Sequence, residues 1–208
     1  MKSDITNSLK EYYAKKFKAH GANSLGVDWG GEEKAEIRYN AMFNLVMNTS
    51  EEISILDVGS GYGGFYEFIT KRIDINKVNF LGIDIVEEMI DHAIKTYPKA
   101  KFLVGDVLNE SFVNEKYDFI VCNGILTQKL SASDKEMEEY MVSLIKKMFD
   151  LCKVGIAFNT MSDMVDFKLD GNFHYPVEKM FKLASSISRH IKIDHAYPLY
   201  EYTTYIYK

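Results

Sequence analysis

The chain has 208 residues, a formal net charge of −5 and 47% hydrophobic residues, which is the length and composition of one globular domain. The acidic balance disfavours a phosphate backbone as a ligand, and no apolar run approaches the roughly 20 residues that span a bilayer, so neither nucleic acid nor a membrane is an expected partner. Two cysteines and a polar start without a secretory signal favour a cytoplasmic protein with no disulfide framework and no metal site.

The first 50 residues are expected to form a helical cap on a main domain at residues 51–208. Residues 5–20 and 32–47 have apolar side chains at helical spacing and predict two amphipathic helices. The Gly-rich segment between them, GANSLGVDWGG at 21–31, is long enough to fold over an opening as a lid.

Strands and helices alternate from residue 52 onward, which predicts an α/β fold with a Rossmann-like, doubly wound sheet of parallel strands. Seven strands are expected at 53–59, 78–84, 101–106, 117–123, 154–160, 191–196 and 202–208. The helices after the cap are expected at 65–73, 86–97, 134–151 and 176–188. The link between the last two strands is too short for a parallel crossover, so they should form a C-terminal antiparallel hairpin.

The sharpest motif is LDVGSGYGG at residues 56–64, directly after the first strand. Gly59 and Gly61 allow a ligand to approach the backbone closely at the carboxyl edge of the sheet. With Gly64 they also satisfy the G-x-G-x-x-G pattern of nicotinamide enzymes, so an NAD(P)-dependent oxidoreductase is the first alternative. Asp57 favours a cationic amine at this position, because its carboxylate would repel a pyrophosphate.

Two further acids follow the next two strands. Asp84 ends the second strand, where a carboxylate can accept both hydroxyl groups of a ribose. Asp106 and Val107 follow the third strand and place a carboxylate and an apolar flank where an adenine would lie. Any one aspartate could be a turn or cap residue. Three of them beside a glycine loop favour a nucleoside that carries an amino acid, which is the chemistry of S-adenosylmethionine (SAM).

Four segments, LDVGSGYGGF, GIDIVEEMI, FLVGD and DFIVCNGIL, resemble the successive motifs of the class I SAM-dependent methyltransferases. The two ends of the chain, AHGANSLGVDWGGEEKAEIRY and HAYPLYEYTTYIYK, resemble a group of small bacterial methyltransferases of unassigned substrate. The resemblance implies SAM as cofactor and S-adenosylhomocysteine (SAH) as product, with Asp57 near the methionine part, Asp84 at the ribose, and Asp106 with Val107 at the adenine. The full set of expected cofactor contacts is Asp57, Gly59, Ser60, Gly61, Asp84, Ile85, Asp106, Val107, Asn123, Trp29 and Arg38.

Two of these contacts have alternatives. Trp29 is expected either to stack on the adenine, to line the acceptor pocket, or to anchor the lid. Arg38 is expected to meet the methionine carboxylate or to pair with a neighbour such as Glu33.

The methyl acceptor is expected at the same sheet edge, because acceptor, methyl and sulfur must be aligned there. His174 is the first candidate for a general base and His195 the second, although a structural role is open for each. The expected substrate contacts are Asp28, His20, Tyr175, Tyr200 and Glu201. A small hydroxylated metabolite or sugar, methylated on oxygen or nitrogen, is the expected acceptor. A non-catalytic SAM-binding regulatory protein is the second alternative, and the sequence leaves monomer and dimer open.

Overall fold

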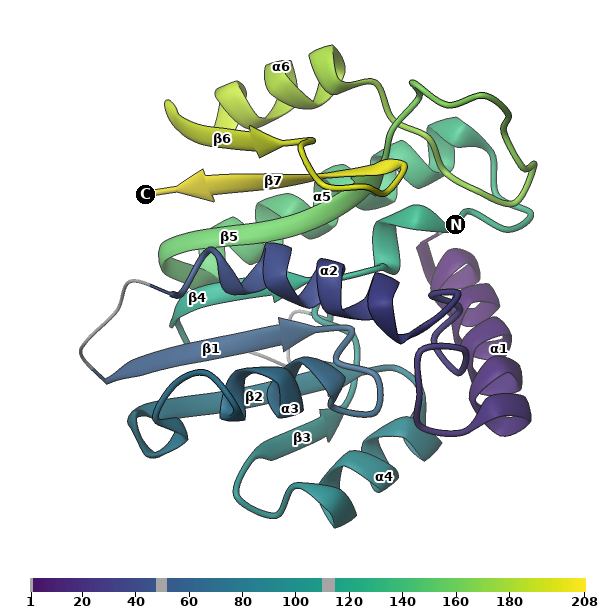
Figure 1. The fold of residues 1–208 in the computed structure, drawn as a ribbon. Helices are drawn as coiled ribbons and strands as arrows, with labels where there is room; N and C mark the ends of the chain where they lie inside the picture. The colour runs from purple at the N-terminus through teal and green to yellow at the C-terminus, as the bar shows by residue number, and fades with distance from the viewer. Residues whose placement is uncertain (1, 48–51, 110–114) are drawn as a thin grey trace.

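Seven strands form one sheet through the residues that the structure describes, 2–47, 52–109 and 115–208 (Figure 1). The structure is a computed structural model. The strands are β1 (Ile53–Val58), β2 (Val78–Asp84), β3 (Lys101–Val104), β4 (Tyr117–Cys122), β5 (Cys152–Met161), β6 (His190–Asp194) and β7 (Glu201–Tyr207). Their order across the sheet is β3-β2-β1-β4-β5-β7-β6, and β7 alone runs antiparallel, to both β5 and β6. The predicted doubly wound sheet with its C-terminal antiparallel hairpin is confirmed.

The central strands are apolar on both faces, as expected of a parallel sheet that is covered by helices on either side. In β1, Ile55 and Leu56 point to opposite faces and are both fully buried. Leu56 belongs to a core cluster shared with two helices, α5 (Asp134–Leu151) and α6 (Val177–Ile187). Ile55 belongs to a cluster shared with α2 (Glu32–Phe43), α3 (Gly64–Thr70) and α4 (Glu87–Thr96). The sheet therefore has two hydrophobic cores, one under each helical layer.

The helices cover the two faces and one edge of the sheet. They are α1 (Lys2–His20), α2 (Glu32–Phe43), α3 (Gly64–Thr70), α4 (Glu87–Thr96), α5 (Asp134–Leu151) and α6 (Val177–Ile187), with short 3-10 turns η1 (Ile75–Lys77) and η2 (Ile125–Thr127). Figure 1 shows α1 standing across the end of the sheet at which the parallel strands finish. None of the helices in the described ranges is long and apolar enough to cross a bilayer.

Most element ends differ from the sequence prediction by one to four residues, and three of them bear on the N-terminal segment or the site. The first helix begins at Lys2, three residues early, and the second ends at Phe43, after which residues 44–47 form turns. The third strand ends at Val104, two residues early, because the Asp106 carboxylate accepts a hydrogen bond from the Leu108 N–H (2.9 Å) and turns the chain out of the sheet.

The N-terminal residues pack into the same cores as the rest of the chain. Ile5 and Leu9 of α1 lie in the core of the α5 side, and Met42 of α2 lies in the core of the α3 side. The Tyr205 hydroxyl of β7 donates a hydrogen bond to the Ala41 carbonyl of α2 (2.7 Å). The expected boundary between cap and main domain, at residues 50 and 51, lies outside the described residues, so that division stays a prediction.

Candidate functional site

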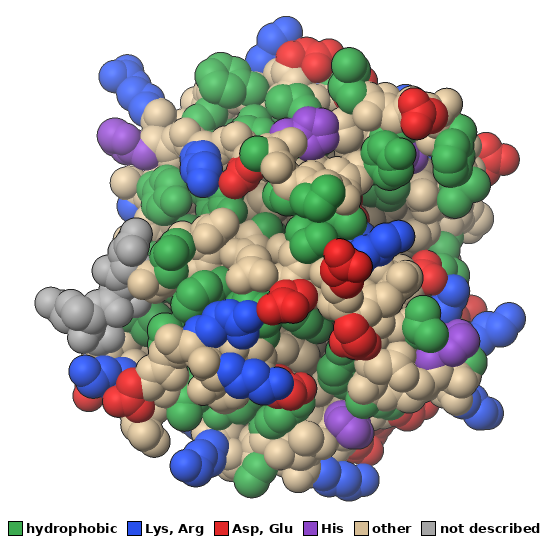
Figure 2. Space-filling model, viewed as in Figure 1, with side chains coloured by type: hydrophobic (Ala, Val, Ile, Leu, Met, Phe, Trp, Pro, Cys, Tyr) green, Lys and Arg blue, Asp and Glu red, His purple; other side chains and the backbone are tan. Residues whose placement is uncertain are grey.

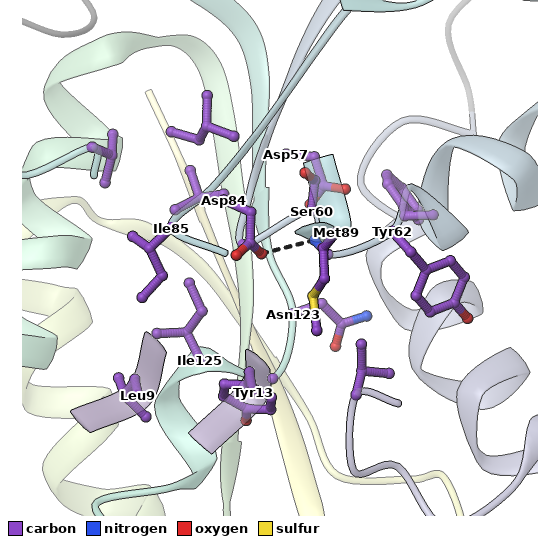
Figure 3. A pocket seen from close by; sticks show the side chains of 18 of the residues that line it. Leu9, Tyr13, Asp57, Ser60, Tyr62, Asp84, Ile85, Met89, Asn123 and Ile125 are labelled. Carbon is purple, nitrogen blue, oxygen red and sulfur yellow. Dashed lines mark hydrogen bonds between the residues drawn. The ribbon is translucent and has the colours of Figure 1, made fainter. Parts of the chain in front are cut away.

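A cavity of about 900 Å³, which includes space open to solvent, lies at the carboxyl ends of β1, β2 and β4 and beside the turn after β3. Figure 3 shows its wall from close by, with Asp57 and Asp84 side by side and Tyr13 of α1 facing them across the opening. Ten of the eleven expected cofactor residues line it. They are Trp29, Asp57, Gly59, Ser60, Gly61, Asp84, Ile85, Asp106, Val107 and Asn123.

The glycine loop after β1 is folded back against β2. The Gly59 and Ser60 N–H groups donate hydrogen bonds to the Ile83 carbonyl (2.8 and 3.0 Å), and the Gly61 N–H donates to Asp84 Oδ2 (2.8 Å; Figure 3). Gly59 has a φ of +75°, and a Cβ there would lie 2.5 Å from the side chain of Ile125. Glycine is therefore required for both the turn and the close approach of the segment after β4.

Asp57, in the cavity wall, has an unusually high pKa for an aspartate. Its residue is 2% exposed, and burial, followed by the nearby negative charge of Asp84, raises the pKa of its carboxyl to about 8. No hydrogen bond to this carboxylate is found among the described residues. The position is thus prepared for a partner that brings a positive charge.

Asp84 and Asp106 are anchored by their own turns. Asp84 accepts hydrogen bonds from the N–H groups of Gly61 (2.8 Å) and Val86 (2.9 Å), which lower its pKa, but burial outweighs them and the pKa of Asp84 is raised overall. Asp106 accepts from the Thr6 hydroxyl of α1 (3.3 Å) as well as from the Leu108 N–H. Both carboxylates are held rigidly and retain capacity to accept further hydrogen bonds from a ligand.

Two polar side chains in the cavity wall are buried without a protein partner. Ser60 Oγ and both polar atoms of the Asn123 amide have no hydrogen-bond partner among the described residues, although both residues line the cavity. Buried polar groups are normally satisfied, so these atoms call for a polar ligand. A nucleoside with an amino acid attached, as in SAM, supplies hydroxyl, amine and carboxylate groups of the kind that these atoms and the three aspartates would bind.

Most of the side chains that form the roof of the cavity were not predicted from the sequence. Leu9 and Tyr13 of α1 and Tyr39 of α2 line it, as do Tyr62 after β1 and Tyr140 of α5. The stripe of apolar residues on the first helix was visible in the sequence, but a stripe that faces a ligand looks the same as one that faces a core. The first two helices therefore enclose the cavity together with the expected lid at 21–31, from which Val27 and Trp29 line it.

Arg38 and Glu201, predicted to bind cofactor and acceptor respectively, do not line this cavity but pair with each other. The Arg38 Nε donates to both Glu201 oxygens (3.0 and 3.1 Å), and the Glu33 pairing considered from the sequence is replaced by this distant partner.

The other expected acceptor residues also lie outside the cavity lining. Asp28 accepts hydrogen bonds from the Tyr12 hydroxyl (2.5 Å) and Lys16 Nζ (2.7 Å), and Tyr175 donates to Glu138 Oε1 (2.8 Å). His20 and Tyr200 have exposed side chains.

Neither of the two histidines proposed as bases lines the cavity, and the two differ in their surroundings. The His174 Nδ1 lies 2.6 Å from the Ser162 carbonyl, while its Nε2 is buried without a partner among the described residues. His195 is exposed, follows the end of β6 rather than lying in it, and packs edge-on against the Tyr202 ring.

Known proteins resemble this chain in sequence and in fold. Residues 55–154 match the family model described as a methyltransferase domain. Rv1506c of Mycobacterium tuberculosis (strain ATCC 25618 / H37Rv), which is named provisionally as a methyltransferase, is 24% identical over 166 residues, or 78% of this chain and 98% of the relative.

Two solved structures share the fold at low sequence identity. Magnesium protoporphyrin IX methyltransferase (ChlM) from Synechocystis PCC 6803 with bound SAH has a TM-score of 0.69 at 12% identity, and the match covers 100% of both chains. The N-methyltransferase NodS from Bradyrhizobium japonicum WM9 has a TM-score of 0.61 at 14% identity over 84% of this chain and 96% of NodS. ChlM has also been crystallised with bound SAM, and that structure has a TM-score of 0.68.

Proposed function

We propose that the chain is a class I SAM-dependent methyltransferase, with SAM as cofactor and SAH as product, and that it methylates a small molecule at a hydroxyl or amine group. The observation that supports a small acceptor most strongly is the roof of the cavity. Tyr13 and Trp29 belong to this roof, and the glycine loop lines the same cavity. A folded protein or a nucleic-acid duplex could not reach the cavity unless these roof residues moved away. ChlM and NodS, by their names, methylate a porphyrin and act as an N-methyltransferase respectively, which is consistent with a small acceptor.

The charge distribution on the visible surface also favours a small acceptor. Figure 2 shows Lys and Arg side chains interspersed with Asp and Glu on the face in view, rather than gathered into one basic patch. A nucleic-acid-binding surface would need clustered positive charge. With a net charge of −5, the chain has no excess of basic residues to supply it.

We assign the cofactor contacts by the chemistry of each cavity position. Asp57 would pair with the amine of the methionine part, Asp84 would accept from the ribose hydroxyls, and Asp106 with Val107 would hold the adenine. The unpartnered Ser60 hydroxyl and Asn123 amide would complete the polar contacts. When bound, SAM supplies the activated methyl group, while the protein supplies orientation and the exclusion of water.

His174 is the side chain that we assign as general base for a hydroxylated acceptor. The Ser162 carbonyl accepts from Nδ1–H and leaves Nε2 as the basic nitrogen. The neighbouring Phe173 N–H donates to the Thr127 carbonyl (2.9 Å) in η2, whose first residue, Ile125, lines the cavity. His174 is outside the cavity lining and its Nε2 is buried, so the proton of the acceptor oxygen would pass to Nε2 only when the bound acceptor displaces the residues between them.

Transfer of label from methyl-labelled SAM to a panel of hydroxylated metabolites, sugars and amines tests this proposal. We expect at least one acceptor to be labelled, and His174→Gln to lower kcat about 100-fold or more with an unchanged affinity for SAH, because a general base contributes about 10²–10⁴-fold. His190→Gln is the matched control, since that histidine is exposed at the start of β6.

Two outcomes would contradict the assignment. If His174→Gln and His190→Gln are equally active, His174 is not the base. If SAM binds but no acceptor in a broad panel is labelled, the second alternative, a non-catalytic SAM-binding protein, is favoured instead.

A further inference from the structure

Five residues form a closed ring of contacts between the N-terminal segment, the C-terminal strands and the cavity wall. They are Trp29, Arg38 of α2, Glu201 of β7, Asn159 of β5 and Gly124 after β4. Two of the five, Trp29 and Gly124, line the cavity, whereas the other three are outside its lining. The ring thus connects the wall of the cofactor cavity to residues that do not touch it.

The first half of the ring is a buried ion pair. Glu201 is 4% exposed, the Arg38 side chain is 12% exposed, and the Arg38 Nε lies 3.0 and 3.1 Å from the two Glu201 oxygens. The same guanidinium donates from Nη1 to the Trp29 carbonyl (3.2 Å) and lies 5.3 Å from the centre of the indole ring. Arg38 therefore fixes both the backbone and the ring of Trp29.

The second half fixes the opposite wall. The Asn159 amide donates to Glu201 Oε2 (2.5 Å), and its Oδ1 accepts from the Gly124 N–H (2.7 Å). Gly124 has a φ of +94°, and a Cβ there would lie 2.9 Å from Trp29 Nε1, so the indole occupies the space that a side chain would need. The residue before Gly124 is Asn123, whose unpartnered amide lines the cavity.

A buried ion pair is weak evidence for stability, because the loss of hydration offsets most of the attraction between the charges. The geometry of this ion pair links the two walls of the cavity. One carboxylate binds Arg38 and Asn159 at once, so the position of Trp29 on one side and of Gly124 on the other is set by the same group.

We propose that Arg38 and Glu201 are positioning residues, which act through Trp29 and Gly124 to close the N-terminal segment over the methionine end of the cofactor. This inference rests on the proposed function. The ring of contacts would hold the two cavity walls at the separation that SAM and its acceptor require. Neither residue needs to contact the cofactor or the acceptor to do so.

Trp29 is the single tryptophan of the chain, so its fluorescence reports on the ring directly. In Glu201→Gln and in the double variant Arg38→Met/Glu201→Met, we expect acrylamide quenching of Trp29 to rise about twofold and the Kd for SAH to rise about tenfold, because Trp29 and Gly124 are no longer held in place at the cofactor site. The double variant leaves no unpaired buried charge and so keeps the test usable if the single variant does not fold. Lys71→Met, which breaks the exposed Lys71–Glu67 pair (2.7 Å), is the control and should change neither value.

Folded variants in which Trp29 stays shielded and the Kd for SAH changes less than about twofold would overturn the inference, because that result is the one expected of a purely structural ion pair. Quenching of Trp29 is measured without ligand. A wild-type protein that fails to bind SAH would therefore contradict the proposed function, while the quenching result would still decide whether the ring holds Trp29.

Discussion

Asp84→Ala is expected to weaken SAH binding by about 100-fold or more, because a carboxylate that accepts two hydrogen bonds from a ribose contributes roughly 1.5–3 kcal/mol for each bond. The substitution also removes the acceptor of the Gly61 N–H (2.8 Å), so the glycine loop loses its link to the end of β2. The cofactor would thus lose both a direct contact and part of its preformed site. Titration calorimetry with SAH measures the effect.

Asp118→Asn is the matched control for this substitution. Asp118 is an aspartate of the same sheet, but it lies near the start of β4 and binds the Ser54 hydroxyl (2.6 Å) and Lys153 (3.3 Å), outside the cofactor cavity. Its replacement should leave the Kd for SAH unchanged in the folded protein. Equal affinities for wild type and Asp84→Ala would remove Asp84 from the cofactor site.

Asp57→Asn is expected to make the ligand-free protein more stable at alkaline pH and, at the same time, to weaken its binding of SAH. The folded-state pKa of about 8 lies above the ordinary value of 3.8, so the folded state favours the neutral carboxyl. The corresponding contribution to stability is present in full below pH 4 and is lost as the pH rises through about 8. A permanently neutral asparagine removes this loss, but it also removes the charge that would pair with the amine of SAM.

Thermal unfolding at pH 6 and pH 9 tests this prediction. Between these values the Tm of the ligand-free wild type should fall by on the order of 5 °C more than that of Asp57→Asn. With SAH bound, the difference should shrink, because the cationic amine favours the charged carboxylate and lowers its pKa. Identical pH profiles for the two ligand-free proteins would show that Asp57 is ionised in the folded state at neutral pH.

The fold and most of the polar residues that line the cavity were predictable from the sequence because both depend on local patterns. A parallel strand that ends in an acid, such as β2 with Asp84, places that acid at the carboxyl edge whatever the distant residues do. The short link before Tyr202 likewise fixed the direction of the last strand. These features follow from strand periodicity and from loop length alone.

The places of Arg38 and of the residues expected at the acceptor were not predictable, because they depend on contacts between distant residues. Arg38 and Glu201 are 163 positions apart, and the sequence around neither residue indicates that the two pair. The register of the last hairpin leaves Tyr200 59% exposed and Glu201 buried, and the sequence offers no means to decide which residue of the link would face inward. The roof residue Tyr13 was indistinguishable from a core residue of an amphipathic helix.

Calorimetric titration of the wild-type protein with SAH and, separately, with NAD measures the central claim directly, since the cavity is proposed to bind a nucleoside bearing an amino acid. We expect one SAH to bind per chain, with release of a proton near neutral pH as Asp57 becomes charged, and no binding of NAD. Binding of NAD without binding of SAH or SAM would contradict the account and restore the oxidoreductase alternative.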